Sequence, residues 1–456
     1  MRTTKTDLLN GPIYKQIFFF FFPIMLGTFF QQLYNTVDAI VVGNYVGKEA
    51  LAAVGGSTAT FINLLINFIN GLASGATVVI AQSYGARDRK GVSDGVKSGM
   101  FLGIALGALL MVVGIVVSPQ LLSSLNVPAD MFNESLIYMR IYLAGLIPMM
   151  VYNVGAGILR AVGDSKRPLY FLIVSCFVNI ILDIILVAVF KTGVVGAAVA
   201  TILSQFAAAI LVIIVLKDKE APYYYNLKKD FGFEKKVLSR IVFIGLPMGI
   251  QSVMYSVSNL FIQASVNSFG IDTVAAYTAF GKIDALYWLI SGAYGAATVT
   301  IVGQCFGAGK IDRAKKSCWT AIYMLVITTV IVSAFCCLTG NFLYNLFTDD
   351  PEVIKIGMDM LLFVAPTWIT FTLIEIFSSA IRACGESMKP MILTGLGICL
   401  FRVIYLLVIP QSSVIQTLYC YPLSWVLTSI LFLIYYLRGN WLKRALAKNN
   451  TSLETN

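Results

Sequence analysis

The sequence predicts an all-α integral membrane protein in which twelve transmembrane helices form two pseudo-symmetric six-helix lobes, related as a parallel repeat. Three observations lead to this fold class. Only 12% of the 456 residues are charged, whereas a soluble domain carries about 25%. Apolar runs long enough to cross a bilayer recur along the whole chain. Motifs of the first half return in the second half at a nearly constant spacing.

The composition limits both the environment and the function. Hydrophobic residues make up 58% of the chain and the mean hydropathy is +0.81, so most of the surface must face the lipid bilayer. The net charge of +10 does not indicate a nucleic-acid partner, because the basic residues lie in short clusters between apolar runs. The chain has no histidine, no HExxH and no GxSxG motif, so we do not expect an enzyme. The eight cysteines form no CxxC pair.

Crossing the hydrocarbon takes about 20 apolar residues. The predicted spans are residues 14–44, 50–80, 95–118, 134–158, 168–190, 194–216, 236–266, 273–302, 315–338, 356–381, 390–410 and 414–437. The apolar run near the N-terminus lacks a small-residue cleavage site, so we expect it to be the first helix and not a removable signal peptide.

Lysine and arginine predict the orientation. Of the 33 basic residues, 27 lie in the two terminal segments and the even-numbered loops. Because basic residues collect on the cytoplasmic side, we expect both termini in the cytoplasm and the protein in the plasma membrane.

The repeat has a spacing of 222 residues. Arg160–Pro168 (RAVGDSKRP) matches Arg382–Pro390 (RACGESMKP), and Gln82–Ala86 (QSYGA) matches Gln304–Ala308 (QCFGA). Six spans per repeat send both halves into the membrane in the same sense, which is typical of transporters with a substrate path between the halves. The predicted domains are an N-terminal lobe (1–216), a cytoplasmic interlobe linker (217–235), a C-terminal lobe (236–437) and a cytoplasmic tail (438–456).

Four polar residues of the first half lie at one depth inside the membrane. They are Asp38 in span 1, Asn179 and Asp183 in span 5, and Thr201 in span 6. At about 1.5 Å of rise per residue, all four lie roughly 10–12 Å below the outer surface. Buried ionisable residues are candidates for a functional site. Two carboxylates with amide and hydroxyl oxygens could bind a monovalent cation such as Na⁺, or hold a proton; the sequence leaves both open.

The second half carries different charges within its spans. They are Lys282, Asp284, Glu375 and Arg402. The repeat places Phe401 opposite Asn179 and Tyr405 opposite Asp183, so the acidic pair is not repeated. A structural ion-pair network and direct substrate contact are both open interpretations. In either case we expect cation handling to be a task of the first lobe.

Several further motifs are specific. They are Pro23 followed by Gln31–Asp38 (QQLYNTVD), Gly47–Gly55 (GKEALAAVG), Gln82–Ala86, the paired Arg-Ala-x-Gly segments, and Gly196–Thr201 (GAAVAT). With these motifs, essentially the whole chain resembles the multidrug and toxic-compound extrusion (MATE) transporters.

The resemblance implies alternating access, with Na⁺ or H⁺ entry driving export of small, cationic, lipophilic drug-like molecules. In this resemblance, Asp38, Asn179, Asp183 and Thr201 occupy the positions of the family's cation site. The resemblance implies no cofactor besides the coupling ion. We expect a monomer. Candidate residues of the substrate pathway are Gln31, Tyr34, Asn259, Lys282, Asp284, Glu375 and Arg402.

Two considerations qualify this interpretation. One branch of the family has carboxylates in helices 7 and 10, but this chain has none in helix 7, and Glu375 lies about one turn from the expected position; we therefore do not expect a second cation site. The alternative function is a lipid-linked saccharide flippase of the same superfamily. A flippase needs cationic side chains for pyrophosphate, and Arg402 with Lys282 is the candidate pair.

Overall fold

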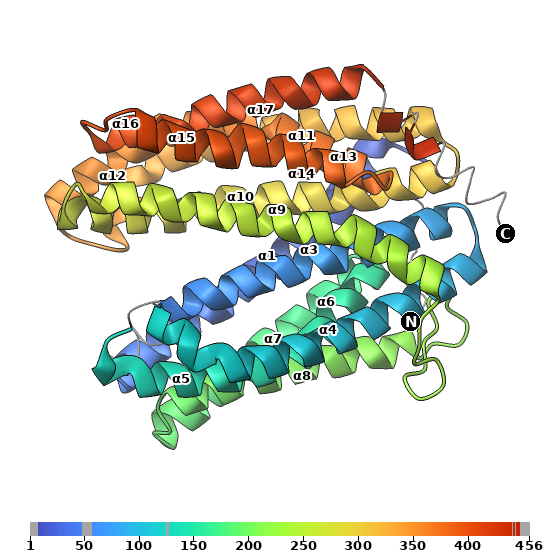
Figure 1. The fold of residues 1–456 in the computed structure, drawn as a ribbon, viewed down its shortest axis with the longest axis horizontal. Helices are drawn as coiled ribbons and strands as arrows, with labels where there is room; N and C mark the ends of the chain where they lie inside the picture. The colour runs from blue at the N-terminus through green and yellow to red at the C-terminus, as the bar shows by residue number, and fades with distance from the viewer. Residues whose placement is uncertain (1–7, 48–56, 125–126, 440, 443, 447–456) are drawn as a thin grey trace. The chain divides into compact units, whose positions relative to one another are not determined.

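The computed structural model describes residues 8–47, 57–124, 127–439, 441–442 and 444–446 (Figure 1). This part of the chain is helical and contains no strand. The elements are α1 (Ile13–Tyr45), α3 (Ser57–Gly85), α4 (Arg89–Ser124), α5 (Ala129–Ala144), α6 (Leu146–Ala161), α7 (Lys166–Asp183), η1 (Ile184–Val189), α8 (Val194–Leu216), α9 (Lys235–Asn267), α10 (Ile271–Gly307), α11 (Ile311–Asn345), α12 (Pro351–Val364), η2 (Ala365–Phe371), α13 (Thr372–Ala383), α14 (Met388–Thr394), η3 (Gly395–Leu400), α15 (Phe401–Val408), α16 (Val414–Leu418) and α17 (Cys420–Leu437).

The predicted number of spans is confirmed. Within the described residues, eleven helical segments are long and apolar enough to cross a membrane, and the number is twelve when α5 and α6 count as one bent span. These two helices meet at an angle of 45°, on either side of Gly145. Pro148 causes part of this break, because proline has no N–H to donate to the carbonyl of Ala144.

Some predicted features lie outside the described residues. These are the start of the second span at residue 50, most of the Gly47–Gly55 motif, and the tail beyond residue 446.

The 222-residue repeat extends to the backbone of two turns. The turn after α6 has Gly163 at φ 93°, and the turn after α13 has Gly385 at φ 91°. The turn after α3 has Arg87 at φ 59°, and its counterpart after α10 has Gly309 at φ 70°. In both pairs the left-handed residue donates to the carbonyl three positions back, and the next residue donates five positions back. These are helix-terminating turns of the Schellman type.

The contacts divide the chain into two units. Among the described residues, unit 1 contains those from 22 to 249, and unit 2 contains residues 8–21 and those from 250 to 446. This division differs from the predicted lobe boundaries at α1 and α9. The start of α1 belongs to unit 2, where Arg313 donates to the carbonyls of Leu8 and Gly11 and to the side chain of Gln16.

Glycines explain why the first half of α9 belongs to unit 1. Gly71 and Gly75 of α3 face Gly245 and Gly249 of α9. A Cβ atom on Gly71 would lie 2.5 Å from the backbone nitrogen of Gly249, so the two backbones are in direct contact. Small residues spaced four apart on each helix permit this close crossing in membrane proteins.

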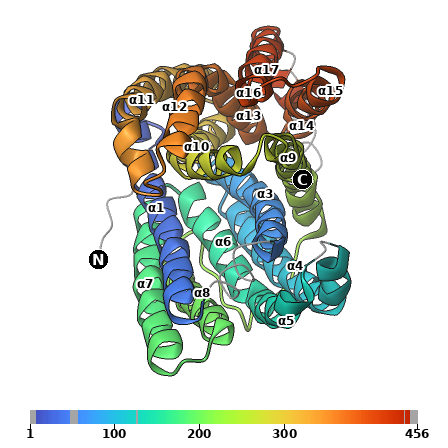
Figure 2. The same cartoon turned by 90° about the vertical axis from the view of Figure 1, so that its left-hand side faces the viewer.

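Each unit has a central helix (Figure 2). In unit 1, α6 contacts α3, α4, α5, α7 and α8, and nearly all of its side chains are buried. In unit 2, α13 is similarly buried and packs on α10, α11 and α17. The outward faces of the other helices carry large exposed apolar side chains such as Val116 and Leu338, as lipid contact requires.

The interlobe segment packs on unit 1. Phe231 and Phe233 contact the ring of Phe101 in α4, and the backbone N–H of Glu234 donates to the Ser98 hydroxyl. Tyr225 is 1% exposed, and burial raises the pKa of its phenol to about 12.

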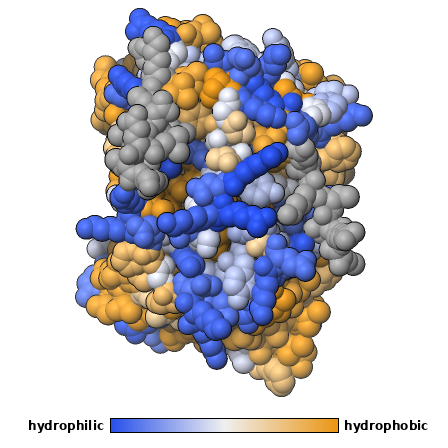
Figure 3. All heavy atoms as spheres, turned by 90° about the vertical axis from the view of Figure 1, so that its right-hand side faces the viewer, coloured by the Kyte–Doolittle hydropathy of each residue, from blue (hydrophilic) through white to orange (hydrophobic). Residues whose placement is uncertain are grey.

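Hydrophilic side chains gather on the helix-end face seen in Figure 3, and apolar side chains lie along its flanks.

Candidate cation site and its counterpart in unit 2

The four polar residues predicted from the first half converge in unit 1. Asp38 comes from α1, Asn179 and Asp183 from α7, and Thr201 from α8. The Thr201 hydroxyl lies 3.2 Å from Oδ2 of Asp38 and 3.0 Å from the carbonyl of Ala197. The Asp38 carboxylate also interacts with Asn179 and Asp183. Their exposed fractions are 8% for Asp38, 4% for Thr201 and 0% for Asn179 and Asp183.

Most polar atoms of this cluster have no hydrogen-bond partner within the described part of the chain. They are Oδ1 of Asp38, both carboxylate oxygens of Asp183, and both amide atoms of Asn179. Buried polar atoms without partners are rare and costly in folded proteins. Oxygen ligands suit hard cations, so the residues fit a monovalent cation or a shared proton. Within the described chain, no group of three or more His, Cys, Asp or Glu residues gathers, so the acidic pair is not part of a larger metal cluster.

Tyrosines and a glutamine surround the acidic pair. Tyr34, one turn before Asp38, is 3% exposed and accepts a hydrogen bond of 3.2 Å from Gln205 Nε2. Gln31 interacts with the Tyr34 phenol. From α5, the buried Tyr138 lies within electrostatic range of both carboxylates. Neutral polar side chains therefore lie next to the acidic pair on this side.

An apolar cluster closes the site toward the end of α1. Its members lie about one turn after Asp38 and Asp183 and about one turn before Thr201. They are Val41, Val42, Ile62, Tyr138, Val187, Val194, Ala197 and Ala198. Part of this seal is the π-helix η1, which begins directly after Asp183. Because the residues of this cluster are apolar and buried, an ion can reach the carboxylates from this end only if the cluster opens.

Unit 2 has a positive charge at the corresponding position. Arg402 of α15 is 2% exposed; it donates to Ser424 of α17 at 3.1 Å and to Asn259 of α9 at 3.3 Å. Its guanidinium carbon lies 4.5 Å from the centre of the Tyr421 ring and 5.8 Å from that of Trp425. These are the first, fifth and sixth helices of the second lobe, which are the same three that form the acidic cluster in the first.

The other charges of unit 2 have neutral partners. Asp284 accepts hydrogen bonds from the indole N–H groups of Trp288 at 2.6 Å and Trp368 at 2.9 Å. The carboxylate of Glu375 accepts a bond of 3.4 Å from the Ser379 hydroxyl. Lys282 is exposed.

The predicted ion-pair network of the second lobe is therefore replaced by hydrogen bonds to uncharged groups. The ion pairs Lys97–Asp230 and Arg167–Asp164 do not involve these residues. Indole and hydroxyl donors satisfy a buried carboxylate without burying a second charge, which explains the difference.

Several partners of these sites were not predicted from the sequence. Gln205 lies one turn after Thr201, so its spacing could have indicated the same face. Tyr138 and Tyr142 are likewise one turn apart on α5. Nothing in the sequence indicates that Trp288 and Trp368, which are 80 residues apart, share one carboxylate.

Comparisons with known proteins agree with this architecture. The MatE family model matches residues 23–185 and 247–408, one segment in each half. The chain is 25% identical over 445 residues to the probable multidrug resistance protein YoeA of Bacillus subtilis, covering 96% of each. It is 25% identical over 447 residues to the probable multidrug resistance protein NorM of Thermotoga maritima, covering 95% of this chain and 94% of that one.

A crystal structure of MATE in the straight conformation has a TM-score of 0.89 and 26% identity, and the match covers 97% of this chain and 100% of that one. The two matched segments of the family model span more than two thirds of the sequence. This chain therefore belongs to the MATE family of multi-pass membrane transporters, whose members are not enzymes.

Proposed function

We propose that the chain is a secondary active multidrug efflux transporter, which exports small cationic lipophilic compounds in exchange for inward Na⁺ or H⁺. The observation that carries the proposal is the acidic cluster of unit 1, where two buried carboxylates share a site with unpartnered oxygens. The names of the proteins similar to this chain, which are multidrug resistance and multidrug export proteins, support multidrug transport. The basic bias of the loops supports a plasma-membrane protein with both termini in the cytoplasm.

The coupling needs only that cation and drug stabilise different conformations. An external cation held by Asp38 and Asp183, with the oxygens of Asn179 and Thr201, would stabilise one arrangement of unit 1. The drug would prefer the other. The apolar cluster around Val42 and Val187 must then open to admit the ion and close behind it. No further cofactor is involved.

The membrane potential drives this exchange when the exported drug carries no net charge. Moving one positive charge inward is worth about 2.3 kcal/mol per 100 mV. At about 1.4 kcal/mol per tenfold change, this free energy opposes a drug gradient of roughly fifty-fold. One monovalent cation per cycle is therefore sufficient for strong efflux of such a drug, whereas one-for-one exchange against a monocationic drug moves no net charge and is driven by the concentration gradient of the ion alone.

The test is ethidium efflux from proteoliposomes, with sodium and proton gradients imposed separately. One of the two gradients should drive efflux by the unaltered protein. Asp38→Asn should reduce this efflux to the background of empty vesicles, because the neutral amide cannot balance the cation, while the abundance in the membrane stays normal. The control is Asp130→Asn, an exposed aspartate of unit 1, which should retain full efflux. Full efflux by Asp38→Asn would overturn the proposal.

The flippase alternative is not favoured. It depended on Arg402 and Lys282 holding a pyrophosphate together. Arg402 is buried and already bonded to Asn259 and Ser424, whereas Lys282 is exposed. The relatives are named for multidrug resistance.

A further inference from the structure

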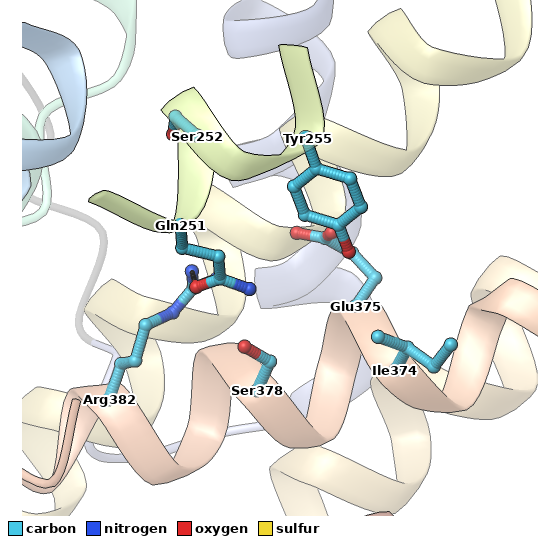
Figure 4. Close-up of a pocket in the computed structure, with 7 residues that line it drawn as sticks. All are labelled: Gln251, Ser252, Tyr255, Ile374, Glu375, Ser378 and Arg382. Atoms are coloured by element: carbon cyan, nitrogen blue, oxygen red, sulfur yellow. Dashed lines mark hydrogen bonds between the residues drawn. The ribbon is translucent and has the colours of Figure 1, made fainter. Parts of the chain in front are cut away.

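Unit 2 contains a polar cavity that the proposed cation exchange does not use. It lies between α9 and α13 and has a volume of about 190 Å³. Its lining is mostly polar, and Figure 4 shows the seven residues: Gln251, Ser252, Tyr255, Ile374, Glu375, Ser378 and Arg382. At about 30 Å³ per water molecule, the cavity has room for roughly six waters or one small organic molecule.

One wall of the cavity carries two opposite charges that do not pair. Glu375, Ser378 and Arg382 follow each other at helical spacing on one face of α13. Seven residues separate the glutamate from the arginine, which is about 10 Å along the helix axis. Their charged groups form no ion pair within 4.0 Å, although they are close enough to influence each other.

The guanidinium of Arg382 is held in place by its neighbours. It donates to the side-chain oxygen of Gln251 at 3.4 Å and to the Ser379 hydroxyl at 3.0 Å. Gln251 is fixed in turn by its bond of 3.0 Å to Thr394. In Figure 4 the guanidinium and the Gln251 amide lie together at one end of the cavity, and Glu375 lies beside the Tyr255 ring at the other. The Ser379 hydroxyl also donates to the Glu375 carboxylate at 3.4 Å, so it links the two charged groups and fixes both in one cavity.

Two donors at this wall remain without partners. The Nε–H of Arg382 is buried and has no acceptor, and the hydroxyl of Ser378, whose residue is 2% exposed, has none either. A buried donor without an acceptor destabilises the folded protein. Both would be satisfied by a carboxylate placed between Ser378 and Arg382.

We propose that this cavity is a binding site for a small zwitterion, with its anionic group on Arg382 and Ser378 and its cationic group on Glu375. A zwitterion compensates both fixed charges at once, whereas an anion or a cation alone leaves the opposite charge of the wall uncompensated in a buried place. The volume limits the ligand to the size of a short amino acid. The site lies within unit 2 and shares no residue with the acidic cluster of unit 1.

The repeat supplies a natural comparison. Arg160 of unit 1 matches Arg382, but Asn153 stands where unit 2 has Glu375, and Ala156 stands where it has Ser378. The anion-binding arginine is thus present in both halves, and its acidic and hydroxyl companions are present only in the second. Arg160→Gln is therefore a matched control.

The experiment measures thermal stabilisation of the purified full-length protein by simple probes. The zwitterions are β-alanine, 4-aminobutanoate and 6-aminohexanoate, which differ in charge separation. Butanoate and butylammonium each carry one of the two charges. At least one zwitterion should raise the unfolding midpoint in a saturable way, and the single-charge probes should not at the same concentration. The zwitterion that stabilises the protein most has a charge separation that matches the distance between Glu375 and Arg382.

Variants identify the site. Glu375→Gln and Arg382→Gln should each weaken the apparent affinity at least about tenfold, as expected when a buried charge loses its partner. Arg160→Gln should retain it. Asp38→Asn should also retain it, so failure of the cation proposal and failure of this one can be told apart. If Arg382→Gln does not fold, Glu375→Gln decides, because it keeps the shape of the side chain.

Three results would overturn the inference. The first is that no zwitterion of the series stabilises the protein. The second is that butanoate or butylammonium acts as well as the zwitterions, which would make the cavity a site for one charge. The third is that the stabilisation is unchanged in Glu375→Gln.

Discussion

The two units use the same three helices for opposite charges. In unit 1 the first, fifth and sixth helices of the lobe bring together Asp38, Asp183 and Thr201, and their oxygens lack sufficient donors. In unit 2 the corresponding helices bury Arg402 between Asn259 and Ser424. Under the proposed function, the first half binds a cation reversibly, whereas the second half has a positive charge fixed on its own side chain.

This difference assigns different tasks to the two halves. A free ion binds with an occupancy that depends on its concentration, so it can shift a conformational equilibrium only where it binds one state better. A tethered guanidinium is present at all ion concentrations, and cation–π contacts with Tyr421 and Trp425 add to its binding. We therefore expect unit 1 to respond to the ion gradient and unit 2 to be indifferent to it.

The strongest way to break this comparison is to give unit 1 its own tethered cation. Ile180 is the residue that the repeat matches to Arg402, and it is half-buried on α7, one turn before Asp183. In Ile180→Arg the guanidinium should occupy the acidic cluster permanently. Gradient-driven ethidium efflux should fall to background, measured in proteoliposomes at matched protein content.

Ile180→Met is the matched control, because it keeps an apolar side chain of similar length and should retain most of the efflux. Efflux by Ile180→Arg that still follows the ion gradient would show that a fixed charge on this helix does not replace the mobile one, and the comparison would fail.

The acidic cluster was predictable because it depends on distance along single helices. Asp38, Asp183 and Thr201 each lie a known number of residues from a helix end, and a fixed rise per residue converts that number into depth. The lateral neighbours were not predictable, because one sequence does not say which faces of two helices meet. Tyr138 joined the site only in the structure for this reason.

The second half shows the opposite outcome. Arg402, Asp284 and Glu375 lie within helices as predicted, and Arg402 is buried, but their partners were not predicted, since tryptophan and asparagine carry no charge that a sequence pattern would match. The unit boundary within α9 was also missed. It depends on Gly245 and Gly249 meeting glycines of α3, and glycines inside an apolar run are too common to predict a contact.

Removing the tethered cation should affect stability and leave coupling unchanged. Arg402→Met keeps much of the side-chain volume but deletes the bonds to Asn259 and Ser424 and the nearby positive charge that Asp284 senses. A buried polar group that loses its hydrogen-bond partner, here the Ser424 hydroxyl, costs about 1–3 kcal/mol. The unfolding midpoint of the detergent-solubilised protein should fall clearly.

Lys282→Met removes an exposed cation of the same unit and should change the stability by no more than about 0.5 kcal/mol. The residual efflux of Arg402→Met should depend on sodium or protons as in the unaltered protein. A changed ion dependence in this variant would mean that unit 2 takes part in coupling, against the division of tasks inferred above.

The smallest expected effect comes from the hydroxyl that completes the acidic cluster. Thr201→Val keeps the shape of the side chain but removes the oxygen that contacts Asp38 at 3.2 Å. A hydrogen bond to a charged group contributes about 1.5–3 kcal/mol, so the ion concentration for half-maximal efflux should rise at least about tenfold, with the maximal rate nearly unchanged. Thr201→Ser restores the oxygen and should restore the affinity. If Thr201→Val and Thr201→Ser reach half-maximal efflux at the same ion concentration, the hydroxyl is not part of the cation site. The two carboxylates and Asn179 would then bind the ion without it.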